Sequence, residues 1–119
     1  MANPNLLNII SAYGKTATFD IAASPTEVLK NPDASNKVYK INSIFLANTQ
    51  GTSPTNVSME FYRGGVGFKI ASTVKVENDS SLVALGKDTG VYLEEGDSLR
   101  CWADDAGFMS GVISYEILG

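Results

Sequence analysis

The chain of 119 residues contains no histidine and a single cysteine. Histidine is the usual general acid or base near neutral pH, so its absence excludes Ser-His-Asp and Cys-His catalysis and every His-containing zinc site. Cys101 cannot form an intrachain disulfide, and it lies in phase with Leu99 in an alternating run, which predicts a buried, inert thiol. We therefore expect no catalytic residue, no metal site and no cofactor, and the chain is not expected to be an enzyme.

Concentrated positive charge and long apolar runs are also missing. The nine Lys and Arg residues are dispersed singly and the formal net charge is −4, whereas a nucleic-acid interface needs a basic face. The apolar stretch from Leu6 to Ile10 is interrupted by Asn8, and no basic residue precedes it. That stretch is predicted to be neither a signal peptide nor a membrane anchor. Nucleic acid and membrane are thus not expected partners, and synthesis inside a cell is expected.

The pattern that fills the chain is that of β-strands. In the run from Thr16 to Ile21, Ala17, Phe19 and Ile21 fall on one face. Similar runs follow at Val38–Asn48, Val57–Phe61, Thr73–Glu77, Leu82–Leu85, Val91–Leu93, Ser98–Ala103 and Gly111–Leu118. Turn residues separate the runs at short and fairly even spacing, and Gly64-Gly65 among them predicts a hairpin connection. The sequence predicts an all-β fold, a β-sandwich or jelly roll of roughly eight to nine antiparallel strands.

Three segments carry finer expectations. The run Val38–Asn48 is apolar on both faces, with Phe45 opposite Ile44, which predicts a central strand covered on both sides. The segment Pro25–Lys30 is the one stretch whose sequence is compatible with a single helical turn. Tyr13-Gly14-Lys15 is expected to be a turn, because glycine tolerates positive φ.

Carboxylates offer little specific chemistry. Asp104 and Asp105 form an adjacent pair with Asp97 nearby in sequence, but the alternating carboxylates of a calcium loop are missing, so these residues are expected to face water. The segment Glu94-Glu95-Gly96-Asp97 predicts a tight turn in which glycine takes a positive φ and aspartate caps the turn. We assign that turn a structural role.

The chain divides into an N-terminal segment, residues 1–12, and a single β-sandwich domain, residues 13–119. Two apolar pairs, Leu6-Leu7 and Ile9-Ile10, do not alternate as a half-buried strand would. The segment is therefore either an edge strand or an arm that docks on a neighbouring subunit, and these four residues are the candidate subunit interface. Trp102 is out of phase with Leu99 and Cys101, so it is expected to point outward as a candidate aromatic contact.

Five stretches together resemble small virion structural proteins of tailed bacteriophages, in particular marine ones. These stretches are Ala2–Asn5, Tyr13–Ala17, Val38–Ile44, Tyr92–Leu99 and Val112–Glu116. More loosely, the Gly-Asp turn and the last strands are similar to trimeric jelly rolls of the tumour-necrosis-factor and complement type. The resemblance assigns no site residues.

What the resemblance implies is a particle component made in the host cytoplasm, most often a capsid decoration (cement) protein on the surface of the head. Its expected partners are further copies of itself, as a homo-oligomer and in particular a trimer, and the major capsid protein or other virion proteins. The alternative is a neck, tail or fibre module that adheres to host glycans through Trp102. A small hydrolase that uses carboxylates is a third hypothesis, although no pair of carboxylates stands out.

Overall fold

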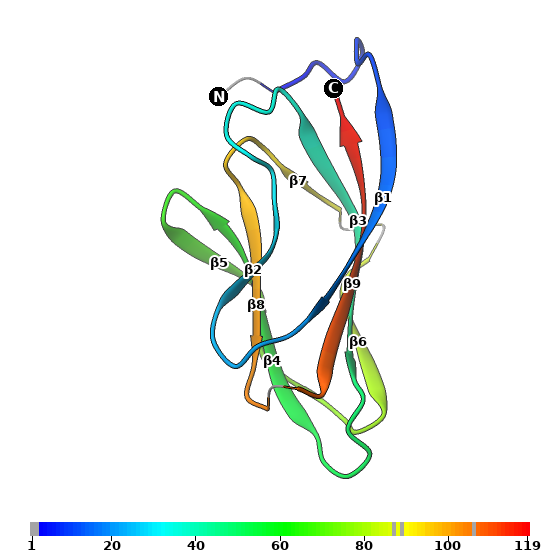
Figure 1. Ribbon diagram of the computed structural model, residues 1–119, viewed down its shortest axis with the longest axis vertical. Helices are drawn as coiled ribbons and strands as arrows, with labels where there is room; N and C mark the ends of the chain where they lie inside the picture. Colours follow the sequence, from blue (N-terminus) through cyan, green and yellow to red (C-terminus); the bar gives the residue numbers. More distant parts are fainter. Residues whose placement is uncertain (1–2, 87, 89, 106) are drawn as a thin grey trace.

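The computed structural model describes residues 3–86, 88, 90–105 and 107–119. These residues form nine β-strands, and no α-helix occurs among them, which confirms the predicted all-β fold. The molecule is elongated, 50 × 26 × 20 Å, and its two sheets face one another along the long axis (Figure 1). Positions 1 and 2 of the N-terminal segment lie outside the described residues. Within the described part, no helix is long and apolar enough to cross a membrane.

The first sheet, called sheet A, has five strands. Four follow the order β1-β9-β3-β6, and β7 also pairs with β3, next to the part of β3 that pairs with β6. Its strands are β1 (Ala12–Asp20), β3 (Val38–Asn48), β6 (Ser80–Leu85), β7 (Val91–Leu93) and β9 (Met109–Leu118). The second sheet, called sheet B, has four strands in the order β2-β8-β4-β5. Its strands are β2 (Thr26–Lys30), β4 (Thr55–Arg63), β5 (Val66–Val76) and β8 (Ser98–Ala103).

This strand order is that of a jelly roll. The chain passes between the sheets after β1, β2, β3, β5, β7 and β8, and all pairings are antiparallel. Strands β6 and β7 pair with different parts of the same β3 strand and together take the place of one strand. When β6 and β7 are counted as one strand, the nine strands form the two four-stranded sheets of a jelly roll.

The core lies between the two sheets. Sheet A contributes Ile44 and Ile113, and sheet B contributes Met59 and Leu99, all with no exposed surface. Cys101 is buried among them, in phase with Leu99, as its place in the alternating run predicts. Burial of apolar surface between facing sheets is the main favourable term for such a fold.

Gly111 on β9 makes room for an aromatic ring. Gly111 pairs with Phe19 of β1, and a methyl group built on its Cα would overlap the Phe19 ring. Phe19 packs against the core, together with Ala17 of the same strand. The glycine therefore lets the edge strand β1 contribute an aromatic side chain to the interior.

The expectation that β3 is covered on both faces is wrong. A bulge between Ile41 and Ser43 inserts one extra residue in β3 opposite β9 and inverts the alternation. Tyr39, Ile41 and Ile44 therefore all face the core side, whereas Phe45 points outward with 43% of its surface exposed. Apolar residues occur at both odd and even positions of β3 because the bulge shifts the alternation, and not because a second layer covers the outer face.

Two local interpretations are also wrong. The segment whose sequence is compatible with a helical turn forms strand β2, where a bulge between Glu27 and Leu29 brings both Val28 and Leu29 against the core. The turn expected at Gly14 does not form, because β1 already begins at Ala12 and pairs with β9 without interruption. In both places tertiary pairing overrides the local turn or helix preference.

Candidate interaction surfaces

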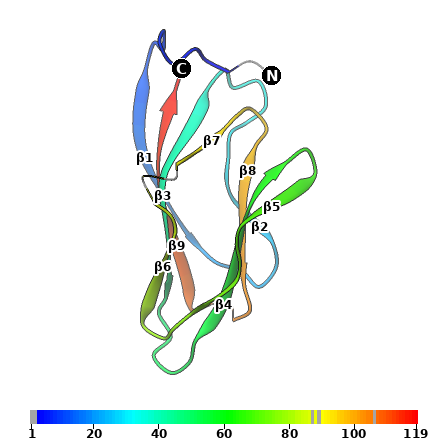
Figure 2. The same cartoon turned by 180° about the vertical axis from the view of Figure 1, so that it is seen from behind.

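The N-terminal segment crosses the end of the molecule where the chain also finishes (Figures 1 and 2). Residues 3–11 contain a short turn but no strand, and hydrogen bonds between Ser11 and Gly119 tie the segment to the end of β9. Asn3 donates a further side-chain hydrogen bond to the Glu94 carboxylate. The segment is thus fixed at both ends while the residues between them lie on the surface.

The four apolar residues of this segment differ in exposure. Leu7 and Ile10 are 92% and 95% exposed, which is close to the full side-chain surface, while Leu6 is 44% exposed and Ile9 is partly buried. Leu6 lines a recess of about 260 Å³ together with Tyr92 and Glu94. Large aliphatic side chains with this much exposed surface gain free energy when another surface covers them.

A second exposed apolar group lies on the outer face of sheet A, and sequence analysis missed it. Phe45 of β3 pairs with Val112 of β9 on one side and with Val83 of β6 on the other. These three residues, here called the outer apolar row, are 43%, 38% and 54% exposed. The bulge in β3 creates the row, so no alternation pattern in the sequence could have located it.

The hairpin between β4 and β5 stands away from the body of the sandwich (Figures 1 and 2). Gly64 and Gly65 both have positive φ, 60° and 80°, as a two-residue hairpin loop of type I′ requires. Val66 and Phe68 beside the loop are 52% and 56% exposed. This confirms the hairpin predicted from the paired glycines and adds a third exposed apolar site.

The outer face of sheet B is covered by charge. Glu60 is 7% exposed and lies 3.8 Å from the Lys69 ammonium and 3.7 Å from the Arg100 guanidinium. Lys69 lies 5.1 Å from the centre of the Trp102 ring, and Arg100 lies 4.4 Å from that of Tyr62. Trp102 is thus on the outer face and partly exposed, with a cation over its ring.

The turn at Glu94–Asp97 is held by buried polar contacts. Gly96 has φ of 85°, and the Glu94 backbone N–H donates to the Asp97 carboxylate at 2.8 Å, so aspartate caps the turn as predicted. Arg63 donates to both carboxylate oxygens of Asp97, from Nε at 2.8 Å and from a terminal nitrogen at 2.5 Å. The hydrogen bond to Asp97 and the negative charges of Asp97 and Glu94 raise the pKa of Arg63 above its usual value. The Arg63–Asp97 pair joins the end of β4 to the turn between β7 and β8.

Buried polar groups elsewhere are similarly satisfied. Asn31 is fully buried; its side chain donates to the carbonyls of Lys37 and Leu93 at 2.9 Å and accepts from Ser35 at 2.6 Å. Across the described residues, no buried side-chain nitrogen or oxygen lacks a hydrogen-bond partner.

The acidic residues considered as calcium ligands each contact a different part of the protein. Asp97 faces Arg63, while Asp104 accepts a hydrogen bond from Asn56 at 2.9 Å. The Asp105 backbone N–H donates to Thr55 Oγ1 at 3.2 Å. No group of three metal-ligating side chains occurs in the described part of the chain.

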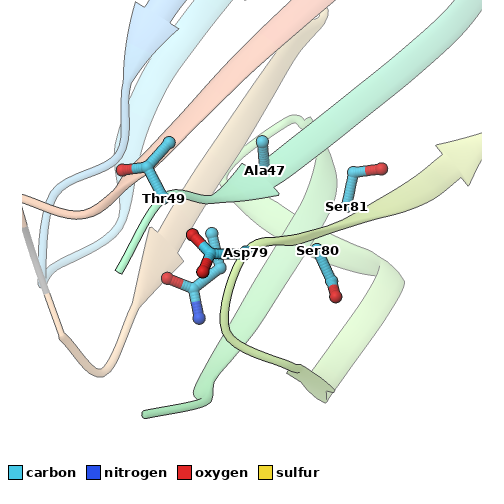
Figure 3. A pocket seen from close by; sticks show the side chains of 6 residues that line it. Ala47, Thr49, Asp79, Ser80 and Ser81 are labelled. Carbon is cyan, nitrogen blue, oxygen red and sulfur yellow. The ribbon is translucent and has the colours of Figure 1, made fainter. Parts of the chain in front are cut away.

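A recess of about 390 Å³ lies at the opposite end of sheet A from the N-terminal segment. Figure 3 shows Ala47 and Thr49 on the side of β3, and Asp79, Ser80 and Ser81 where β6 begins. Asn48 completes the lining, but its amide already donates to the carbonyls of Ser53 and Val76. With one carboxylate and short hydroxyl side chains, the recess lacks the paired groups of a hydrolytic site.

Burial accounts for the state of Cys101. The residue has no exposed surface, and desolvation raises the pKa of its thiol to about 12, although a backbone hydrogen bond to Trp102 partly opposes that shift. A thiol that stays protonated at neutral pH is neither a nucleophile nor a metal ligand.

No protein-family model and no curated protein matches the chain. Among solved structures, a chain of the Bacillus endospore appendages, which form disulfide-linked pili, is similar with a TM-score of 0.51 at 22% identity, over 91% of this chain and 85% of that one. A chain from the acid-stable capsid of the Helicobacter pylori bacteriophage KHP30 is similar with a TM-score of 0.55 at 12% identity, over 94% of this chain and 90% of that one. At these identities the likeness establishes a shared fold, and both similar proteins belong to polymeric assemblies.

Proposed function

We propose that the protein is a structural component of a bacteriophage particle, and that it decorates the capsid surface. The observation that carries the proposal is the exposed apolar surface of the N-terminal segment, where Leu7 and Ile10 are 92% and 95% exposed on a rigid jelly roll. A fold shared with a chain of a phage capsid supports the virion location, and the sequence resemblance to phage virion proteins supports decoration. A decoration protein of this kind needs surface to bind with and no reactive groups.

In this proposal the N-terminal segment is a docking arm. Leu6, Leu7, Ile9 and Ile10 pack on a neighbouring subunit, and the protein forms a small symmetric homo-oligomer, a trimer. The trimer bridges neighbouring copies of the major capsid protein or other virion proteins. Because the contact surfaces meet only in the assembled shell, the binding free energy stabilises the shell and not its separate parts.

Cryo-electron microscopy of the particle tests the location. We expect density for the jelly roll on the outside of the head, at positions that contact more than one capsid subunit. Density restricted to the tail would remove the decoration role. Density on the head without contact between residues 3–11 and a neighbour would remove the docking arm and leave the location standing.

A second candidate function is an adhesion module of the neck, tail or fibre, favoured by Trp102. Its ring is partly exposed on the outer face of sheet B, and a carbohydrate can stack on such a ring. Trp102 is the one tryptophan of the chain, so its fluorescence reports directly on this site. Titration with host-surface glycans that shifts the emission would favour adhesion; unchanged emission at millimolar glycan would count against it.

A further inference from the structure

Every open β-sandwich exposes unpaired backbone N–H and C=O groups along the edges of its sheets, and three of the four edges here are interrupted. Strand β2 has 5 residues, follows Pro25 and contains a bulge. Strand β5 has two register shifts, and Thr73 within it has φ of 51°. The remaining edge is divided between β6 and β7. Short strands, prolines and bulges are devices that keep an edge from pairing with another chain.

The β1 edge is neither short nor bulged nor broken by proline, and its two charged residues are Lys15 and Asp20. Its 9 residues, Ala12–Asp20, pair with β9 in continuous register, and the strand contains no proline. β1 is drawn in front of β9 and β3 in Figure 1, and no other strand of the described chain pairs with its free side. One long, regular edge is therefore available for pairing.

The hydrogen-bond phase shows which groups point to that free side. Ser11 and Gly119 exchange two backbone bonds, of 3.2 and 3.0 Å, and the Ile21 N–H donates to the Met109 carbonyl at 3.0 Å. Because partners in an antiparallel ladder alternate, the odd-numbered residues of β1 bond to β9. The even-numbered residues then direct their N–H and C=O groups outward: Ala12, Gly14, Thr16, Thr18 and Asp20.

We propose that β1 pairs antiparallel with β1 of a second copy of this chain, across a two-fold axis at Thr16. Sheet A then continues from one subunit into the next. Gly14 pairs with Thr18 of the second copy, and all outward groups are used, giving about ten hydrogen bonds between the chains. The contact deepens the self-association proposed above and rests on it, but it is two-fold and uses β1, so it joins one docking-arm trimer to another and does not form the trimer itself.

The side chains of β1 fit this register. The even-numbered residues that flank the axis on the outer face are small or β-branched: Gly14, Thr16 and Thr18. On the inner face Lys15 would lie opposite Ala17, which leaves room for the longer side chain. Asp20 would lie opposite Ala12, so no like charges meet directly.

The placement of the charges favours a second copy over a different protein, because reversing β1 about Thr16 puts Lys15 opposite Ala17 and Asp20 opposite Ala12. A strand whose outward groups fall on alternate residues on both sides of a central Thr16 is complementary to itself when reversed, as an isologous contact requires. An unrelated chain would need its own matching edge. The test below distinguishes these occupants.

Single cysteines report the register directly. Cys101 is buried and its thiol stays protonated, so Thr16→Cys would supply the reactive thiol. We expect Thr16→Cys to form a disulfide-linked dimer under mild oxidation, because residues opposite each other across a ladder lie within disulfide range. Gly14→Cys and Thr18→Cys are expected not to cross-link alone but to cross-link when mixed; a methyl group at Gly14 meets no atom within 4 Å.

The same series can overturn the proposal. Absence of a Thr16→Cys dimer would exclude the two-fold contact, and efficient self-linking of Gly14→Cys would exclude this register. Cross-linking of Thr16→Cys only to another virion protein would assign the edge to that partner instead.

Backbone and charge variants test the contact by analytical ultracentrifugation. Thr16→Pro removes an N–H that does not serve β9, so the subunit should stay folded while the β1-linked dimer is lost. Thr16→Val keeps the N–H and is the matched control, expected to associate like the natural chain.

Thr16→Lys and Thr16→Glu should each raise the dissociation constant of the β1 contact about fivefold, and mixing the two variants should restore pairing. Unfolding by urea verifies that each variant is folded.

A docking-arm variant separates the two self-association contacts. Leu7→Asn with Ile10→Asn should weaken the trimer but leave the Thr16→Cys cross-link intact. Loss of the cross-link in that variant would overturn an independent β1 contact. Loss of trimer without loss of the cross-link would support both proposals, and an unchanged trimer with an intact cross-link would overturn the docking arm alone.

Discussion

The two faces of sheet A both carry large apolar residues, but these residues differ in what they do. On the inner face Ile44 and Ile113 have no exposed surface and pack against sheet B. On the outer face, their chain neighbours Phe45 and Val112 are 43% and 38% exposed. Residue type alone therefore does not separate residues that hold the fold from residues available for contact. The phase of the strand, set by the bulge in β3, makes that distinction.

The largest expected effect is at the inner face. Ile44→Ala removes buried methyl and methylene groups and leaves a cavity between the sheets, so the free energy of unfolding should fall by about 3 kcal/mol. Urea unfolding followed by circular dichroism would show a lower midpoint with an unchanged slope. A loss well under 1 kcal/mol would mean that this face is not packed as described.

Gly111 offers a smaller test on the same face. Gly111→Ala places a methyl group against the Phe19 ring, and the expected loss is about 2 kcal/mol because an overpacked core must shift. Val112→Ala, one residue away and facing outward, is the matched control and should cost less. Combining Gly111→Ala with Phe19→Leu should recover part of the loss, and absence of any recovery would contradict the overlap.

Cys101 tests the inner face of sheet B through its pH dependence. Burial raises the thiol pKa to about 12, so the folded thiol stays protonated while the unfolded thiol ionises near its usual, lower pKa. Stability from this group is therefore intact below the unfolded pKa and falls progressively as pH rises toward 12. Relative to a Cys101→Ala variant, the natural chain should lose about 1 kcal/mol between pH 8 and pH 10.

Reaction of Cys101 with a thiol reagent gives a kinetic readout of the same burial. At pH 8 the native protein should react far more slowly than the urea-unfolded protein. Rapid reaction of the native protein would place the thiol at the surface.

The smallest effect on stability is expected at the outer apolar row. Phe45→Ala removes a larger side chain than Ile44→Ala but should lower the free energy of unfolding by less than about 1 kcal/mol, because the ring is already half in water. Unfolding of the two variants side by side provides the measurement. Equal losses for Ile44→Ala and Phe45→Ala would show that the two faces are equivalent after all.

The strands themselves could be predicted from the sequence because alternation and turn residues are local signals. The predicted hairpin at Gly64-Gly65 and the capped turn at Gly96-Asp97 are confirmed for the same reason, since positive φ favours glycine. The bulges in β2 and β3 could not be predicted, because a bulge depends on which partner residues a strand meets. They account for the wrong interpretations at Pro25–Lys30 and Phe45.

The candidate contact surfaces were only partly visible in the sequence. The apolar pairs of the N-terminal segment stood out because they break the alternation, and Trp102 stood out by its phase. The pairing of Arg63 with Asp97 joins positions 34 residues apart. The cations over the Trp102 and Tyr62 rings likewise lie on different strands from those rings. Such contacts follow from strand order, which no local pattern encodes.

The hydrogen-bonded pair Ser11 and Gly119 has a consequence for how the molecule can be attached to other things. It brings the two ends of the described chain to one pole, and the loops around Thr49 and Asp79 lie at the other pole (Figures 1 and 2). A fluorescent protein or affinity tag fused at either terminus would emerge from the same pole. The far pole would remain unobstructed, so immobilised molecules would all present it in one orientation.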